Sequence, residues 1–77
     1  MRYTTRVTGP DSLGQLIQQA RVASGQTQAE LADELGISQR TITEIETGKS
    51  TKQMRRVFQL LTTVGVTLNG EWEVSDG

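Results

Sequence analysis

The chain has 77 residues, a formal net charge of −1, and neither cysteine nor histidine, which excludes disulfides and thiolate metal sites and removes the commonest general base and metal ligand. We therefore expect no catalytic residue, no metal and no cofactor in a single domain, residues 1–77, whose small size favours self-association. Because residues 1–10 are polar and charged and no apolar run approaches the ~20 residues of a membrane span, the sequence predicts a cytoplasmic protein without membrane contact.

The first ten residues are expected to be extended. Tyr3, Thr5 and Val7 alternate with Arg2, Thr4 and Arg6. This period of two suits either a short strand or a loose basic arm. A helical period follows, for which Asp11 or Ser12 can provide the cap and Ser12 with Gln15 a capping box. Gly25 fits the left-handed stop of this first helix.

Two short helices come next. Thr27 and Glu30 form a capping box for a second helix, which closes at Gly36. Ser38 can cap a third helix, which ends at Gly48. The outward face of the third helix carries hydrogen-bonding side chains, namely Gln39, Arg40, Thr43, Glu44 and Thr47.

A fourth helix and a strand complete the chain. Residues 50–53 cap the helix, whose inner stripe before Gly65 consists of Met54, Val57, Phe58, Leu61 and Val64. The period then changes to two over residues 66–74. Asn69-Gly70 is a strong hairpin signal, but a turn there would set every apolar residue opposite a polar one, so a straight strand is the better interpretation.

An unpaired amphipathic strand leaves its backbone edge open, and a second copy of the chain can close that edge by antiparallel pairing about a two-fold axis. We therefore predict a homodimer built on the strand at 66–74, with residues 2–7 able to join the same sheet. The predicted interface residues are Val66, Leu68, Trp72 and Val74.

Two short helices joined at residues 35–38 are typical of the helix-turn-helix, whose second helix lies in the major groove of DNA. Residues 12–65 also resemble phage Cro and repressor domains, on the residues Arg21, Gly25, Thr27 to Ala32, Gly36 to Gln39, Thr41-Ile42 and Ile45 to Lys49. The resemblance implies a mainly α, lambda-repressor-like fold of four to five helices, with the DNA-binding core over residues 11–65.

The DNA-facing residues follow from this resemblance and from their chemistry. Gln28 resembles the phosphate-gripping Gln of the family, while Gln39 and Arg40 stand on the first turn of the recognition helix, where Gln can bridge adenine N6 and N7 and Arg can bridge guanine O6 and N7. The further predicted DNA-binding residues are Ser38, Thr41, Thr43, Glu44, Lys49 and Lys52. The alternative for Thr41 and Thr43 is that they are ordinary surface residues of the helix that do not contact DNA.

Glu44 has two interpretations, because a carboxylate repels phosphate unless it accepts a hydrogen bond from cytosine N4. It either reads a base or pairs with Arg40 one helical turn earlier. Arg21 and Glu46 resemble the ion pair that links the first helix to the end of the third in this family, and we interpret that pair as structural.

Basic residues gather where DNA would lie, since five of the eight fall between residues 40 and 56. An enzyme would need a nucleophile with a base or a set of metal ligands, and those residue types are missing. A pure protein-interaction adaptor would need a third helix poor in base-reading groups, and Gln39 and Arg40 argue against it.

Nearly the whole chain resembles the HipB antitoxins, on the extended start running into Pro10 to Leu13, the stretch Leu60 to Gly65, and Val66 to Leu68 directly after it. This resemblance implies a repressor of its own operon that binds an inverted-repeat operator on double-stranded DNA as a homodimer and neutralises a HipA-like serine/threonine kinase toxin. The alternative is a stand-alone phage-type or cellular regulator of the XRE family without a toxin partner.

Overall fold

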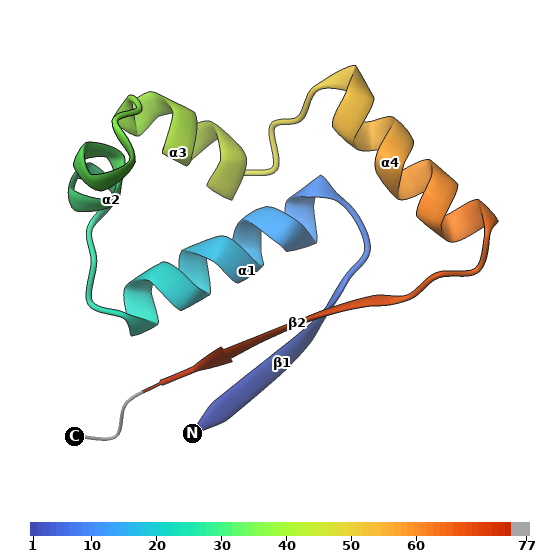
Figure 1. Ribbon diagram of the computed structural model, residues 1–77, viewed down its shortest axis with the longest axis horizontal. Helices are drawn as coiled ribbons and strands as arrows, with labels where there is room; N and C mark the ends of the chain where they lie inside the picture. Colours follow the sequence, from blue (N-terminus) through green and yellow to red (C-terminus); the bar gives the residue numbers. More distant parts are fainter. Residues whose placement is uncertain (75–77) are drawn as a thin grey trace.

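The computed structural model describes residues 1–74, which form four helices lying on one side of a two-stranded sheet (Figure 1). In chain order the elements are β1 (Arg2–Val7), α1 (Pro10–Ala23), α2 (Gln28–Leu35), α3 (Gln39–Glu46), α4 (Lys52–Thr63) and β2 (Leu68–Glu73). The mainly α fold with a C-terminal strand is therefore confirmed. The last three residues of the single domain expected over 1–77 lie outside the described residues.

The two strands pair with each other in antiparallel fashion, with Val7 opposite Leu68. The N-terminal segment is thus a strand and not a loose arm. β2 runs straight through Asn69 and Gly70, as predicted from the alternation of apolar and polar residues. It begins at Leu68, however, and not at residue 66 as predicted. One of the two edges of β2 is therefore occupied by the chain's own N-terminal strand.

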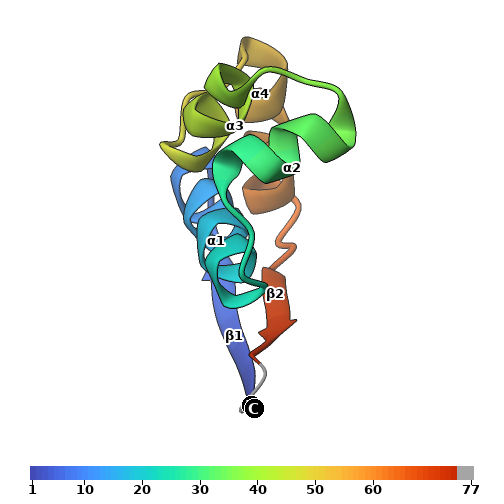
Figure 2. The ribbon, with the colours of Figure 1, turned by 90° about the vertical axis from the view of Figure 1, so that its left-hand side faces the viewer.

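One face of the sheet is turned toward α1 (Figure 2). Tyr3 and Trp72 are cross-strand partners whose rings stack, with centroids 5.6 Å apart and planes inclined by 23°. A Cβ atom at Gly70, on the same face as Trp72, would collide with the side chain of Leu16 in α1. The glycine thus allows α1 to lie directly on the sheet.

The start of α1 differs from the prediction. The N-cap is Gly9 and Pro10 occupies the first helical position, where the missing N–H of proline costs nothing. Ser12 lies inside the first turn, and its hydroxyl accepts a hydrogen bond from the Gly9 amide at 3.1 Å. The expectation that Asp11 or Ser12 caps the helix, with a box to Gln15, is therefore wrong, because the helix already starts at Pro10 and both residues lie inside its first turn.

The other three helices begin at side-chain caps within the predicted segments. Thr27 and Glu30 bond reciprocally at 3.0 Å in each direction, and the backbone N–H of Thr27 donating to the Glu30 carboxylate lowers the pKa of that residue. Ser38 and Thr51 each accept from the amide three residues later. Each helix is followed by a glycine of positive φ at the predicted position, namely Gly25, Gly36, Gly48 and Gly65.

A second close approach joins α1 to α3. Gly14 is buried, and a Cβ atom there would collide with the carbonyl oxygens of Ile45 and Glu46 at the end of α3. The backbone of α1 can therefore contact the backbone of α3 directly. This contact fixes the position of the third helix, the element expected to meet DNA.

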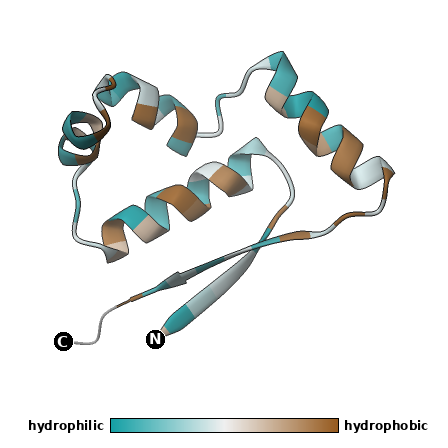
Figure 3. Ribbon diagram, viewed as in Figure 1, coloured by the Kyte–Doolittle hydropathy of each residue, from teal (hydrophilic) through white to brown (hydrophobic). Residues whose placement is uncertain are grey.

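The buried core of the described chain is small, and its apolar residues are Val7, Ala32, Ile42 and Phe58. Much of the predicted inner stripe of α4 remains exposed, including Met54, Val57 and Val64. Figure 3 shows this apolar residue pattern along α4, which packs only loosely against α1.

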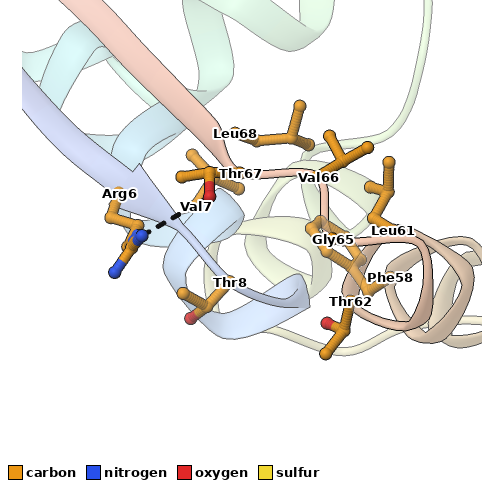
Figure 4. Close-up of a pocket in the computed structure, with 10 residues that line it drawn as sticks. All are labelled: Arg6, Val7, Thr8, Phe58, Leu61, Thr62, Gly65, Val66, Thr67 and Leu68. Atoms are coloured by element: carbon orange, nitrogen blue, oxygen red, sulfur yellow. Dashed lines mark hydrogen bonds between the residues drawn. The ribbon is translucent and has the colours of Figure 1, made fainter.

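A pocket of about 270 Å³ lies between the end of α4 and the strands (Figure 4). Arg6 closes one side of it by donating to the Thr67 hydroxyl at 3.5 Å. Phe58 and Leu61 contribute apolar walls, so the pocket marks incomplete packing of α4 on the sheet.

Candidate nucleic-acid interface

The helix-turn-helix consists of α2, a turn at Gly36, and α3. Gly36 adopts φ 69° and ψ 30°, and the Ile37 amide donates to the carbonyl of Ala32 at 3.0 Å, which closes α2 and redirects the chain. Ser38 then caps α3 by accepting from the Thr41 amide. Only one apolar residue of α3, Ile42, is buried, so the helix lies on the core by one edge and leaves its polar face outward.

A buried ion pair holds α3 against α1, as the sequence resemblance implied. Arg21 Nε donates to Glu46 Oε2 at 2.7 Å and Arg21 Nη2 to Oε1 at 3.0 Å, and the side chains are only 10% and 2% exposed. The third guanidinium nitrogen donates to the carbonyl of Gln26 at 2.9 Å. The contact between Arg21 and Glu46 is therefore bidentate. Arg21 lies near the end of α1, Glu46 at the end of α3, and Gln26 in the loop between α1 and α2.

The ion pair changes the pKa values of both Arg21 and Glu46. The hydrogen bonds from Arg21 hold the pKa of Glu46 below its usual value, with a smaller contribution from Gln28. The same contact raises the pKa of Arg21. Both groups are therefore held in their charged forms in the folded protein.

Gln28 links this ion pair to the outward face of α3, a role that the sequence did not predict. Its Nε2 donates to Glu46 Oε1 at 3.0 Å, and its Oε1 accepts from Thr43 Oγ1 at 3.0 Å and from Gln39 Nε2 at 3.5 Å. The first residue of α2 is thus bonded to both turns of α3. The expected phosphate-gripping residue also positions the recognition helix.

The predicted base-reading side chains stand together at the start of α3. Gln39 is oriented by Gln28, whereas Arg40 is 84% exposed and donates from Nε to Glu44 Oε1 at 3.1 Å. Lys49, from the loop after α3, lies 3.7 Å from the same carboxylate oxygen. The pairing of Glu44 with Arg40, one of its two interpretations, is therefore present in this structure.

The threonines of α3 use their hydroxyls within the protein. Thr41 shares a 2.8 Å hydrogen bond with the Ser38 cap. Thr43 donates to Gln28, and Thr47 donates to the carbonyl of Thr43 at 2.9 Å. Their methyl groups and the exposed surface of the helix remain available to a groove.

A group of basic side chains lies on α4, the helix that follows the recognition helix in the chain. Lys52, Arg55 and Arg56 line one surface pocket together with Gln59, and Arg55 Nη1 donates to the carbonyl of Ser50 at 2.8 Å. Arg55 and Arg56 were not among the predicted contacts. The signal for them was present, because residues three and four apart share one face of a helix.

Other classes of site find no support in the described part of the chain. Among residues 1–74 no group of His, Cys, Asp or Glu side chains could hold a metal ion. No helix in this part is long and apolar enough to cross a membrane.

Two comparisons agree with this geometry. A helix-turn-helix family model matches residues 17–70. An uncharacterized HTH-type transcriptional regulator of Sinorhizobium fredii, y4mF, is 34% identical over 64 residues, which cover 83% of this chain and 84% of that protein. No solved structure matches the chain at comparable significance. The chain therefore belongs to the helix-turn-helix family of DNA-binding transcriptional regulators.

Proposed function

We propose that this regulator is a repressor that binds an inverted-repeat operator as a homodimer, and that it serves as the antitoxin of a type II toxin-antitoxin system whose toxin is a HipA-like serine/threonine kinase. The observation that carries the DNA-binding part is the exposed polar face of α3, held in place by Arg21, Glu46 and Gln28. Such a repressor would act in the cytoplasm, bound to the nucleoid.

The roles of individual residues follow from hydrogen-bonding chemistry. Gln39 can accept from and donate to one adenine, and Arg40 can donate twice to one guanine. These two residues would specify the sequence. The residues that would position the protein on the phosphate backbone are Gln28, Ser38, Thr41, Thr43, Lys49 and Lys52.

The free edge of β2 supports the proposed dimer. The Val74 amide donates to the Met1 carbonyl at 2.8 Å, and the N-terminal ammonium of Met1 donates to the Val74 carbonyl at 2.9 Å. Because such pairs alternate along an antiparallel ladder, the even-numbered residues of β2 bond to β1, and Asn69, Glu71 and Glu73 turn their backbone groups to the other edge. A second copy can bond to these groups without disturbing β1.

The charges on β2 select a register for this pairing. A two-fold axis at Gly70 would set Leu68 opposite the partner's Trp72 and Asn69 opposite the partner's Glu71, with no like charges facing each other. An axis at Glu71 would place two carboxylates directly opposite, which is unfavourable. We therefore favour the axis at Gly70, which would give a four-stranded sheet in the order β1, β2, and the partner's β2 and β1.

Exposed apolar residues beside this edge also favour association. The end of α4 and the segment leading into β2 expose Leu60, Val64, Val66 and Leu68. An apolar surface of this kind on a chain with so small a core is typical of an interface. A dimer of fixed geometry would set the two recognition helices roughly 34 Å apart, one turn of DNA, or a multiple of that distance.

The antitoxin role rests on the resemblance of nearly the whole chain to HipB. An extended N-terminal strand before α1, and a strand that follows α4 after the short segment 64–67, support this proposal. The alternative is a stand-alone regulator without a toxin partner. The two functions share every DNA-facing residue, so the DNA interface cannot distinguish them.

Two measurements test the proposal. Selection of binding sites from random duplex DNA should yield an inverted repeat, and failure to enrich any sequence would contradict specific repression. Co-purification from the native operon, followed by mass analysis of the complex, should reveal a kinase-like chain bound to two copies of this protein. A complex with DNA that contains only this chain would favour the stand-alone regulator.

A further inference from the structure

Glu44 stands out among the groups of the recognition face, because it is the only carboxylate on the outward face of α3; the other acidic residue of that helix, Glu46, is buried. Its side chain is 38% exposed and lies 3.1 Å from Arg40 and 3.7 Å from Lys49. It therefore contacts one residue assigned to base reading and one assigned to phosphate binding.

This arrangement opposes DNA binding in a defined way. Arg40 and Lys49 must turn toward guanine and phosphate, and exposed ion pairs are weak enough to allow this. Glu44 would then face the DNA polyanion with its own countercharges withdrawn. Each sequence that offers Glu44 no hydrogen-bond donor therefore carries an electrostatic penalty.

The major groove offers two amino donors, cytosine N4 and adenine N6, but the N7 acceptor beside adenine N6 repels a carboxylate, so cytosine is the better partner. Cytosine N4 is a donor that Glu accepts from, and it is presented on the same groove edge as the guanine O6 and N7 groups that Arg recognises. Arg40 and Glu44 are one helical turn apart on the same face of α3, so Glu44 would meet the base pair next to the one that Arg40 reads.

We propose that Glu44 is a specificity-determining residue that weakens binding to all DNA except where the base pair next to the guanine read by Arg40 presents a cytosine amino group to Glu44. This inference rests on the proposed function. Glu44 restrains Arg40 and Lys49 in the free protein, and only a cytosine amino group compensates the carboxylate once both cations have moved to DNA.

The test compares the wild type with E44Q on a selected operator in which each base pair is varied in turn. Gln preserves the size and hydrogen-bonding reach of the side chain but removes the charge. We expect E44Q to bind non-operator duplex more tightly, and its preference for one cytosine to fall from roughly 5- to 150-fold toward none. D33N is the matched control, because it changes the net charge equally at an exposed residue of α2 that is assigned neither to DNA nor to the edge of β2.

The outcomes separate this inference from the proposed function. If the wild type enriches no sequence, the proposed function fails. If the wild type selects an operator and E44Q shows the same preference at every position, Glu44 reads no base and the inference is wrong. A gain in affinity that is equal on all sequences, or equal in E44Q and D33N, also overturns it. A thermal melt of E44Q that matches the wild type establishes that the comparison is between folded proteins.

Discussion

At the scale of single residues, the recognition face depends on a chain of hydrogen bonds that begins in the interior. Arg21 holds Glu46, Glu46 holds Gln28, and Gln28 holds Thr43 and Gln39. A residue on α1 thus positions a predicted base-reading group on α3 without contacting DNA. Stability and recognition are therefore coupled through Gln28.

Replacing Arg21 by Ala should destabilise the protein and change its response to pH. Because the folded state lowers the pKa of Glu46, the stabilisation is full above the usual value of 4.5 and is lost as the pH falls through the lower folded value. We expect the melting temperature of Arg21→Ala to lie about 5 °C or more below that of the wild type at pH 7, and the gap to narrow below pH 4.5.

Thermal melts across this pH range provide the measurement. Arg2→Ala is the matched control, since its ion pair with Glu73 is largely exposed and should contribute little. Equal melting temperatures for Arg21→Ala and the wild type at neutral pH would show that the pair does not stabilise the fold.

Arg40 and Lys52 should differ in how their loss affects binding. Arg40→Ala should cost about 1–3 kcal/mol at the operator and relax the preference at one base pair, whereas Lys52→Ala should weaken all sequences alike and reduce the salt dependence by about one counterion. Binding titrations on a systematically mutated operator, at several salt concentrations, distinguish the two. Identical losses on all sequences for both variants would contradict the assignment of Arg40 as a base reader.

At the scale of elements, the position of α3 is fixed by its backbone contact with α1 at Gly14. In an ordinary helix interior Ala is more stable than Gly by roughly 0.5–1 kcal/mol. Here a methyl group would meet two carbonyl oxygens that belong to the rigid end of α3. The contact, and not helix propensity, therefore decides which residue is tolerated.

We expect Gly14→Ala to lower the free energy of unfolding by about 1–3 kcal/mol, the usual range for overpacking. Chemical denaturation monitored by circular dichroism measures this change. Gln15→Ala is the control, because Gln15 is an exposed residue of the same turn of α1 and a methyl group there meets solvent. If Gly14→Ala is as stable as Gln15→Ala, α1 and α3 are not in backbone contact.

At the scale of the whole molecule, the open questions are what covers the free edge of β2 and the exposed side of α4. Replacing Leu68 and Trp72 by Asp would not isolate the edge, because Trp72 stacks on Tyr3 within the same chain. A proline at Glu71 is more selective. It removes an N–H that points away from β1, and proline is tolerated at such positions of edge strands.

Glu71→Pro should therefore yield a folded monomer, while Glu71→Ala, which keeps the N–H, should remain a dimer. With one recognition helix instead of two, operator affinity should fall on the order of 100-fold. Analytical ultracentrifugation and operator titration measure both effects. A Glu71→Pro protein that stays dimeric with full affinity would place the interface elsewhere, on the exposed apolar side of α4.

The local structure of this protein could be predicted from its sequence. Side-chain caps at Thr27 and Ser38, glycines after each helix, and a change of period after Gly65 act over a few residues, so each can be recognised in the chain itself. The straight course of β2 was also predicted from the sequence, because only an unbroken strand places its apolar residues on one face. The ion pair of Arg21 with Glu46 came from family resemblance and not from these local rules.

Other features depended on contacts between distant residues. The pairing of β1 with β2 joins residues more than 60 positions apart, and the hydrogen bonds of Gln28 join α2 to α3. The apolar stripe of α4 stays exposed because the other elements of the described chain cover little of it. Even the start of α1 was misplaced, because capping competed with the constraint that Pro10 imposes. Hydrogen bonds within one turn are set by local sequence, whereas contacts across the molecule depend on the path of the whole chain, and only the tertiary structure reveals that path.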